Sequence, residues 1–213
     1  MMQRVLAFVL PTVLVVCASS LKISAMAATE AASGAKANRP DVKVGDQWKF
    51  QCVDYYGVKS DRLWVITSID QAGIKGTENG QPLVLTPDMN VLESPRRKDS
   101  DLRLLSFPLE VGKQWTAVDK FVSEEGRLES EGSSNLSVAV AGYEKVRVVA
   151  GEFDAFKLES NSTYTTKTSR SSSIGSAQST YWYAPAAHIV VKRETFIKAA
   201  RDACELVEFR LQP

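Results

Sequence analysis

His188 is the single histidine in the chain, and histidine is the side chain best suited to move protons near neutral pH. It follows the run Tyr181-Trp182-Tyr183-Ala184-Pro185 at the expected start of a strand, where it could act as a general base. One histidine cannot build a multi-histidine zinc site, and the sequence holds no G-x-S-x-G motif whose serine it would activate. We therefore expect His188 to be a surface residue, and the sequence points to no metal and no cofactor.

The carboxylates offer a second kind of chemistry, since two acids with different pKa values can hydrolyse a glycosidic bond. They stand in two small groups, Asp99 with Asp101, and then Glu124, Glu125, Glu129 and Glu131. No surrounding pattern selects a pair, and the glutamates fit a solvated hairpin tip. A secreted hydrolase that uses a carboxylate pair is therefore kept as an alternative.

Tyr181, Trp182 and Tyr183 are the candidate ligand-binding residues. Consecutive residues of a strand point to opposite faces, so Trp182 opposes both tyrosines. One face must join the core, and the other then exposes aromatic surface that could bind a sugar or an acyl chain. The competing interpretation is packing within the core and between sheets, which tryptophan and tyrosine favour in any case.

The first residues have the order of a secretory signal peptide. Arg4 supplies a basic start, residues 5–18 form an apolar run, and Ser24-Ala25-Met26-Ala27 places small residues where a signal peptidase inspects the chain. We expect residues 1–27 to be removed by cleavage between Ala27 and Ala28. The mature protein is then expected to be periplasmic or secreted.

Two alternatives to cleavage are weaker. A permanent anchor would need ~20 apolar residues, and Pro11 interrupts a run that is already short. A lipoprotein anchor would use Cys17, but Val16 precedes it where a small residue is expected. No second apolar run is long enough to span a bilayer, so we expect no membrane span after signal cleavage.

Cys52 and Cys204 are the cysteines that remain after cleavage, and an even count in an oxidising compartment predicts a disulfide. The bridge would join the first expected strand to the last. In the loop-entropy model, closing so long a loop stabilises the fold by about 5 kcal/mol. Two separate buried thiols are the alternative.

Net charge excludes little and suggests no polyanionic partner. The whole chain carries a formal charge of +1, and Arg4 and Lys22 are lost with the signal peptide. A mature chain so close to neutral gives no indication of nucleic-acid binding or of attraction to an anionic membrane.

Short apolar runs broken by turn residues fill the chain from Val42 onward, which is typical of antiparallel sheets. We predict a disordered leader over 28–41 and a single, mainly β domain over 42–213, folded as a sandwich or an open barrel. Asn79-Gly80 is a strong hairpin signal. The serine-rich residues 166–179 are expected to form a mobile connection.

One pattern occurs twice. Val44-Gly45-Asp46-Gln47-Trp48 matches Val111-Gly112-Lys113-Gln114-Trp115, as a glycine that can adopt a positive φ followed by a strand with a tryptophan anchor. Duplicated halves would produce such a match. We favour two similar turns, because little else aligns at the same spacing.

These two segments, together with Val149-Ala150-Gly151-Glu152-Phe153-Asp154-Ala155-Phe156 and Tyr181-Trp182-Tyr183-Ala184-Pro185, resemble a group of uncharacterised exported bacterial proteins, some of which are labelled TapB-like. The order of the segments covers most of the mature chain. The resemblance implies a β-rich envelope domain without an assigned activity.

The sequence favours a non-enzymatic binding or accessory module of the cell envelope. Its partner would be another envelope protein, met at a strand edge or at the Tyr181–Tyr183 segment, or an apolar ligand. In one version, the cavity of an open barrel carries a lipid or another apolar molecule. A purely structural domain is the third hypothesis beside the hydrolase.

Overall fold

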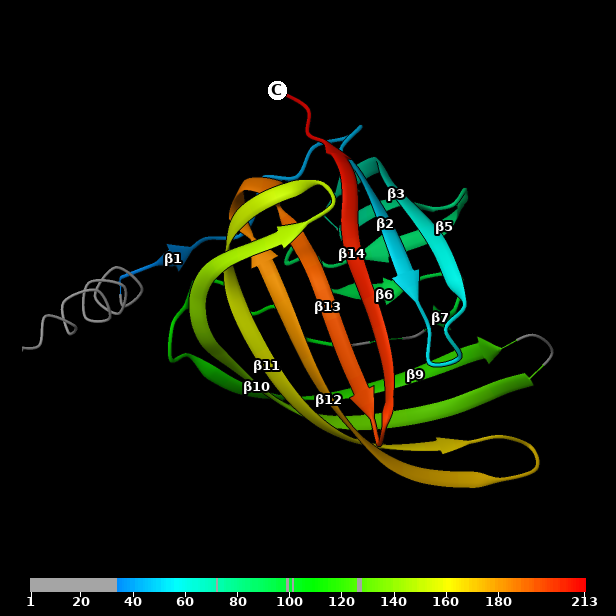
Figure 1. The fold of residues 1–213 in the computed structure, drawn as a ribbon. Helices are drawn as coiled ribbons and strands as arrows, with labels where there is room; N and C mark the ends of the chain where they lie inside the picture. The colour runs from blue at the N-terminus through cyan, green and yellow to red at the C-terminus, as the bar shows by residue number, and fades with distance from the viewer. Residues whose placement is uncertain (1–33, 72, 99, 101, 126–127) are drawn as a thin grey trace, which may run out of the picture.

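The computed structural model describes residues 34–71, 73–98, 100, 102–125 and 128–213, with the side chains of 124, 125 and 128 left aside. The predicted signal peptide and its cleavage site at Ala27 and Ala28 lie outside the described residues, as do Asp99 and Asp101. The fold is almost entirely antiparallel sheet (Figure 1). The predicted mainly β architecture is confirmed, and of its two predicted forms the chain adopts the open barrel.

Within the described residues, the strands and a short helix follow in chain order: β1 (Lys36–Ala37), β2 (Gln47–Val53), β3 (Lys59–Asp70), β4 (Gly73–Glu78), β5 (Gln81–Leu85), β6 (Val91–Glu93), β7 (Arg97–Lys98), β8 (Leu109–Glu110), β9 (Gln114–Glu125), β10 (Leu128–Val148), β11 (Gly151–Lys167), β12 (Ser172–Ala184), the 3₁₀ helix η1 (Pro185–Ala187), β13 (Ile189–Ile197) and β14 (Ala200–Arg210).

One twelve-stranded sheet forms the barrel, in the order β6-β5-β4-β3-β2-β14-β13-β12-β11-β10-β9-β7. The two ends of this order, β6 and β7, meet at a tight turn in which Ser94 and Arg97 exchange backbone hydrogen bonds of 2.7 and 3.1 Å. The sheet therefore nearly closes on itself and leaves little free edge. Figure 1 shows the β9–β10 and β11–β12 hairpins extending past the ends of β13 and β14.

The start of the domain differs from the expected disordered leader. Within residues 34–41, β1 pairs with β8 in a separate two-stranded sheet, and Ala37 is buried in the core. Arg39 adds an ion pair to Asp88 at 2.5 Å. Ala37 fills a core position, but the residues around it show no apolar periodicity. The sequence pattern therefore did not predict this strand.

The serine-rich segment also differs from its prediction. Most of residues 166–179 belong to β11 and β12, where Thr166 pairs with Ser173 and Thr165 with Ile174. The first part of β12 is held by backbone hydrogen bonds to β11, and its side chains are largely exposed. The predicted Asn79-Gly80 hairpin is confirmed, with φ values of 51° and 80° that suit its tight turn.

Trp48 lies fully buried in the core, and its indole Nε1 donates a 2.7 Å hydrogen bond to the carbonyl of Ala187. Just before it, the buried carboxylate of Asp46 accepts hydrogen bonds from the backbone N–H groups of Lys43 and Gln212, at 2.8 and 2.7 Å. These contacts fix the start of β2 to η1 and to the C-terminal residues. No helix in the described part of the chain has the length and apolar character that crossing a bilayer requires.

Candidate ligand cavity

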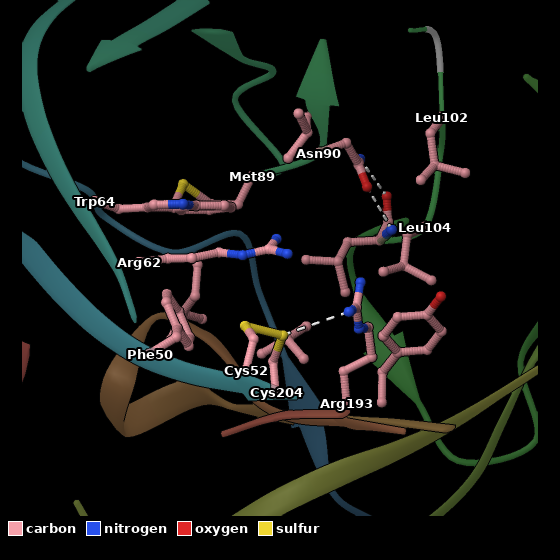
Figure 2. Close-up of a pocket in the computed structure, with 15 residues that line it drawn as sticks. Phe50, Cys52, Arg62, Trp64, Met89, Asn90, Leu102, Leu104, Arg193 and Cys204 are labelled. Atoms are coloured by element: carbon pink, nitrogen blue, oxygen red, sulfur yellow. Dashed lines mark hydrogen bonds between the residues drawn. A yellow bond between two sulfur atoms is a disulfide. The ribbon is translucent and has the colours of Figure 1, made fainter. Parts of the chain in front are cut away.

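A cavity of about 220 Å³ lies between strands β2, β3, β12, β13 and β14 on one side and residues 89–91 and 102–105 on the other, and it opens to solvent. Figure 2 shows its lining, in which apolar and aromatic side chains surround two arginines and a disulfide. The lining residues are Phe50, Cys52, Arg62, Trp64, Met89, Asn90, Val91, Leu102, Leu104, Leu105, Tyr181, Ile189, Val190, Arg193 and Cys204.

The alternation of β2 and β3 builds one wall. Phe50 and Cys52 stand two residues apart on β2, so both side chains point inward. Across the strand pair, Phe50 is opposite Arg62, and its ring meets that of Trp64 edge-on with centroids 5.7 Å apart. Edge-to-face packing of this kind holds both rings in place and leaves their outer surfaces facing the cavity.

Asn90 fixes the opposite wall. Its side-chain Nδ2 donates to the carbonyl of Leu105 at 2.9 Å, and its Oδ1 accepts the N–H of the same residue at 2.7 Å. This paired contact anchors the segment that carries Leu104. The backbone of Leu105 satisfies both the donor and the acceptor of the Asn90 side chain. The polar Asn90 can therefore hold an apolar segment in place.

Arg193 enters from β13, where it lies opposite Tyr181 of β12 and Cys204 of β14. Its Nη2 hydrogen-bonds to the Asp202 carboxylate and lies 3.4 Å from the Cys204 Sγ. Its Nε is buried and has no hydrogen-bond partner among the described residues. Burial and the nearby Asp202 carboxylate raise the pKa of Tyr55 to about 12, so this phenol is neutral beside the ion pair.

Arg62 enters from β3 and is less well paired. Its Nε lies 3.9 Å from the Glu78 Oε1, which is too long for a hydrogen bond, and is buried without a partner among the described residues. Glu78 is itself engaged, since its Oε2 accepts a 3.0 Å hydrogen bond from the Trp64 indole. Burial lowers the pKa of Arg62, yet a guanidinium remains charged at physiological pH.

The three predicted aromatic residues are divided between different surroundings. Tyr181 lines the cavity. Tyr183 is buried in the core, with its ring 5.2 Å from that of Phe107, and its burial raises the pKa of its phenol. A bulge between Trp182 and Tyr183 interrupts the register with β13.

Trp182 lies away from the cavity. Its Nε1 donates to Glu144 at 2.8 Å, and the Lys192 ammonium lies 4.8 Å from its ring centre. The contacts of Trp182 and Tyr183 are those of packing, so of the three aromatic residues only Tyr181 reaches the cavity. Whether it binds a ligand there stays a prediction.

The predicted Cys52–Cys204 disulfide is present and forms part of the cavity wall. The two cysteines face each other directly across β2 and β14, with their Cα atoms 4.0 Å apart. The bridge therefore joins neighbouring strands that are 152 residues apart in the sequence.

The residues considered for catalysis do not gather at the cavity. His188 follows η1 with a positive φ of 59°, and its Nδ1 is buried without a partner among the described residues. Glu129 and Glu131 lie on β10, on the hairpin whose tip the sequence predicted, and both are exposed. No cluster of three or more potential metal ligands occurs in the described part of the chain.

Among the described residues, two carboxyl groups have shifted pKa values, and both pKa values are lowered, whereas a general acid needs a raised one. A hydrogen bond from Lys36 lowers the pKa of Glu110 at the surface. Burial raises the pKa of Glu194, but hydrogen bonds from Lys192 and Arg201 outweigh burial and the net shift is downward. A glycosidase acid needs a raised pKa, so neither group fits that role.

A larger hollow of about 760 Å³ lies over the outer side of β9 to β13. Its lining is rich in serine, threonine, asparagine and glutamine, and many of these side chains are exposed. Such a surface keeps its water, because its polar groups are already solvated. The smaller inner cavity therefore has the better chemistry for an apolar ligand.

No family model matches the chain, and no curated protein matches it. The resemblance to the TapB-like group therefore stays a prediction.

Three solved structures resemble the fold at low sequence identity. A candidate exported protein with a YmcC-like fold from Bacteroides fragilis shares 13% identity, with 82% of this chain and 99% of that chain covered and a TM-score of 0.45. A candidate lipoprotein from Parabacteroides distasonis shares 11%, with 81% and 98% covered and a TM-score of 0.46. The hypothetical lipoprotein YmcC of Escherichia coli shares 14%, with 76% and 84% covered and a TM-score of 0.48.

The sequence pattern around Arg62 and Arg193 did not indicate that they are site residues. Arg62 follows Asp61, and Arg193 stands between Lys192 and Glu194, and charged residues in such runs are normally placed on the solvent face. The available signal was the position of Arg62 two residues before Trp64, which puts both side chains on one face.

Proposed function

We propose that this protein is a non-enzymatic binding module that holds a small apolar ligand, or the apolar end of a larger one, inside its barrel. The observation that carries the proposal is the cavity of about 220 Å³, which opens to solvent and is walled mainly by aromatic and aliphatic side chains. An apolar cavity of ~150 Å³ is enough to hold benzene, whereas drug-sized ligands occupy ~300–1,000 Å³.

Binding is proposed to take place outside the cytoplasm, in the periplasm or after secretion. The N-terminal sequence with Ala27 and Ala28 at its cleavage site supports this location, and so does the Cys52–Cys204 disulfide, which persists in oxidising compartments. We propose residues 28–213 as the mature chain, with one β domain.

Native mass spectrometry tests the proposal on protein exported by its own signal and purified without detergent. We expect a mass that begins at Ala28, reduced by two hydrogens for the disulfide, together with an adduct that is released on denaturation. Absence of any adduct, combined with no uptake of added alkanols, would overturn ligand binding. A mass that retains residues 1–27 would overturn the proposed cleavage alone.

A variant that fills the cavity locates the ligand. Leu104→Trp adds bulk to the wall, so uptake of an alkanol should fall at least about tenfold if the cavity holds it. The matched control is Ile174→Trp, which adds the same bulk at a residue that is 84% exposed on β12. Equal uptake by both variants would place the ligand elsewhere.

A further inference from the structure

Two guanidinium groups reach into the cavity whose other walls are mainly apolar, and this arrangement indicates the chemistry of the ligand. Figure 2 shows Arg62 extending beneath Trp64 and Met89, and Arg193 rising beside the disulfide toward Leu104. A purely apolar ligand would gain nothing from either cation, and it would further separate both from water.

The Arg62 guanidinium is poorly paired. Its side chain is only 20% exposed, and Glu78, its ion-pair partner among the described residues, lies at 3.9 Å and accepts a hydrogen bond from Trp64 instead. The Nε of Arg62 is buried and makes no hydrogen bond within the described part of the chain. A buried donor without a partner is costly, and a bound anion would relieve the cost.

Charged groups of both signs lie near Arg62. Among the described residues, Arg96 and Arg193 are cations that act on it, and Glu78 and Asp202 are anions. Arg193 is held by Asp202, so Arg62 is the cation free to accept a new partner.

We propose that the ligand is an amphiphile with an anionic head, a carboxylate or a phosphate, bound to the guanidinium of Arg62 with its apolar part against Phe50, Trp64 and Leu104. This inference rests on the proposed function and narrows its ligand class. The planar fork of arginine matches two oxygens of either head group, and a charge-assisted, paired contact of this kind is strong. Arg193 adds its field and an unused Nε donor.

Calorimetric titration with four probes tests the inference on the disulfide-bonded mature protein: decanoate, decyl phosphate, decanol and inorganic phosphate. We expect decanoate or decyl phosphate to bind at least about tenfold more tightly than decanol, as hydrogen bonds to a charged group would give. The stronger of the two identifies the head group as a carboxylate or as a phosphate.

Substitutions of Arg62 test whether this residue causes the preference for an anionic head group. Arg62→Met should remove the preference for the anion, so that decanoate and decyl phosphate bind no more tightly than decanol. Arg62→Lys keeps the charge but loses the planar fork of donors, so its affinity for the anions should lie between those of the wild type and of Arg62→Met. The matched control Arg147→Met removes the same charge from a side chain that is 84% exposed and should bind as the wild type does. Far-UV circular dichroism and the melting temperature confirm that each variant is folded.

The outcomes separate this inference from the proposed function. Equal binding of decanol and both anions by the wild type overturns the anionic head and leaves the apolar site in place. An anion preference that survives Arg62→Met overturns the role of Arg62. Binding of inorganic phosphate as tight as that of decyl phosphate shows an anion site without an apolar one, and binding of no probe removes the proposed function itself.

Discussion

The units β2–β3–β4 and β9–β10–β11 share one backbone plan and present different inner faces. In each, a glycine with positive φ precedes the first strand, with values of 94° at Gly45 and 89° at Gly112. The Gly45 N–H donates to the Ile66 carbonyl at 2.8 Å, and the Gly112 N–H donates to the Val140 carbonyl at 2.9 Å. The same glycine turn and the same hydrogen bond from its glycine to the second strand thus occur twice.

The correspondence continues beyond the turns. A bulge follows Ile66 in the β3–β4 pair and Val140 in the β10–β11 pair. The third strand of each unit then begins at a glycine with φ near the same value, 139° at Gly73 and 138° at Gly151. The sequence match was interpreted as two similar turns, and the structure extends the similarity to three strands.

The difference lies in the side chains that this shared plan turns inward. In the first unit, Phe50, Cys52, Arg62 and Trp64 line the cavity. At the matching positions of the second unit, Leu136 and Val138 are packed in the core, and the carboxylate of Asp119 is buried against Arg97 and the Ser100 hydroxyl.

The two units therefore share a backbone arrangement but differ in how closely their inner faces pack. Bulky rings and a long cation on one unit hold the opposite wall away and leave space, whereas short aliphatic side chains on the other allow close packing. The cavity is a property of side-chain choice on a repeated scaffold.

The largest expected effect compares the two tryptophan anchors. Trp48→Ala removes a fully buried ring and its hydrogen bond to Ala187, so the free energy of unfolding should fall by about 3–5 kcal/mol. Trp115 is partly exposed, and Trp115→Ala should cost below about 2 kcal/mol. Urea unfolding of both variants measures the difference, and equal losses would mean that the anchors are equivalent.

Next in size is the disulfide, which the second unit lacks. Replacing both Cys52 and Cys204 by serine should lower the free energy of unfolding by about 2–5 kcal/mol. Hydrogen exchange should accelerate most in β2 and β14, which the bridge joins, and least in β9 and β10. Uniform acceleration across the barrel would show that the bridge does not act locally.

The two turn glycines give a smaller contrast. Alanine at either position is strained by the positive φ, at a cost of about 1–2 kcal/mol. At Gly45 the added Cβ would also meet the Gln212 side chain at 3.2 Å, while at Gly112 it would meet nothing within 4 Å. Thermal unfolding should therefore rank Gly45→Ala below Gly112→Ala, and the reverse order would contradict this role of Gln212.

The smallest expected effect on stability is at the cavity. Arg62→Met removes a half-buried cation whose ion pair with Glu78 is long, and the Trp64 indole still donates to the Glu78 carboxylate, so the free energy of unfolding of the unliganded variant should fall by less than about 1 kcal/mol. Arg193→Met leaves Asp202 without its partner and should cost about 1–3 kcal/mol. A large loss for Arg62→Met would indicate a structural role instead of a binding role.

The sequence was sufficient for features that depend on neighbouring residues or on simple periodicity. The strand alternation around Trp48, the Asn79-Gly80 hairpin and the Cys52–Cys204 bridge were all predicted and are confirmed. Each has a local signal, since alternation, turn residues and cysteine count can be found without knowledge of the fold.

The cavity could not be predicted in the same way. It depends on Arg62 of β3 and Arg193 of β13 entering one cavity, and on the Asn90 contact that anchors the segment carrying Leu104. These residues come from separate segments, and only the strand order brings them together. The first part of β12, residues 172–179, was missed for a related reason, because its serines pair through the backbone and show no apolar period.

Crystals grown with a decanoate that carries bromine at its terminal carbon would test the central claim most directly, because anomalous scattering locates that atom. The account predicts a bromine peak inside the barrel, in contact with Phe50, Trp64 or Leu104. A peak in the polar hollow over β9 to β13, or no peak at a saturating concentration, would contradict the assignment of the inner cavity as the ligand site.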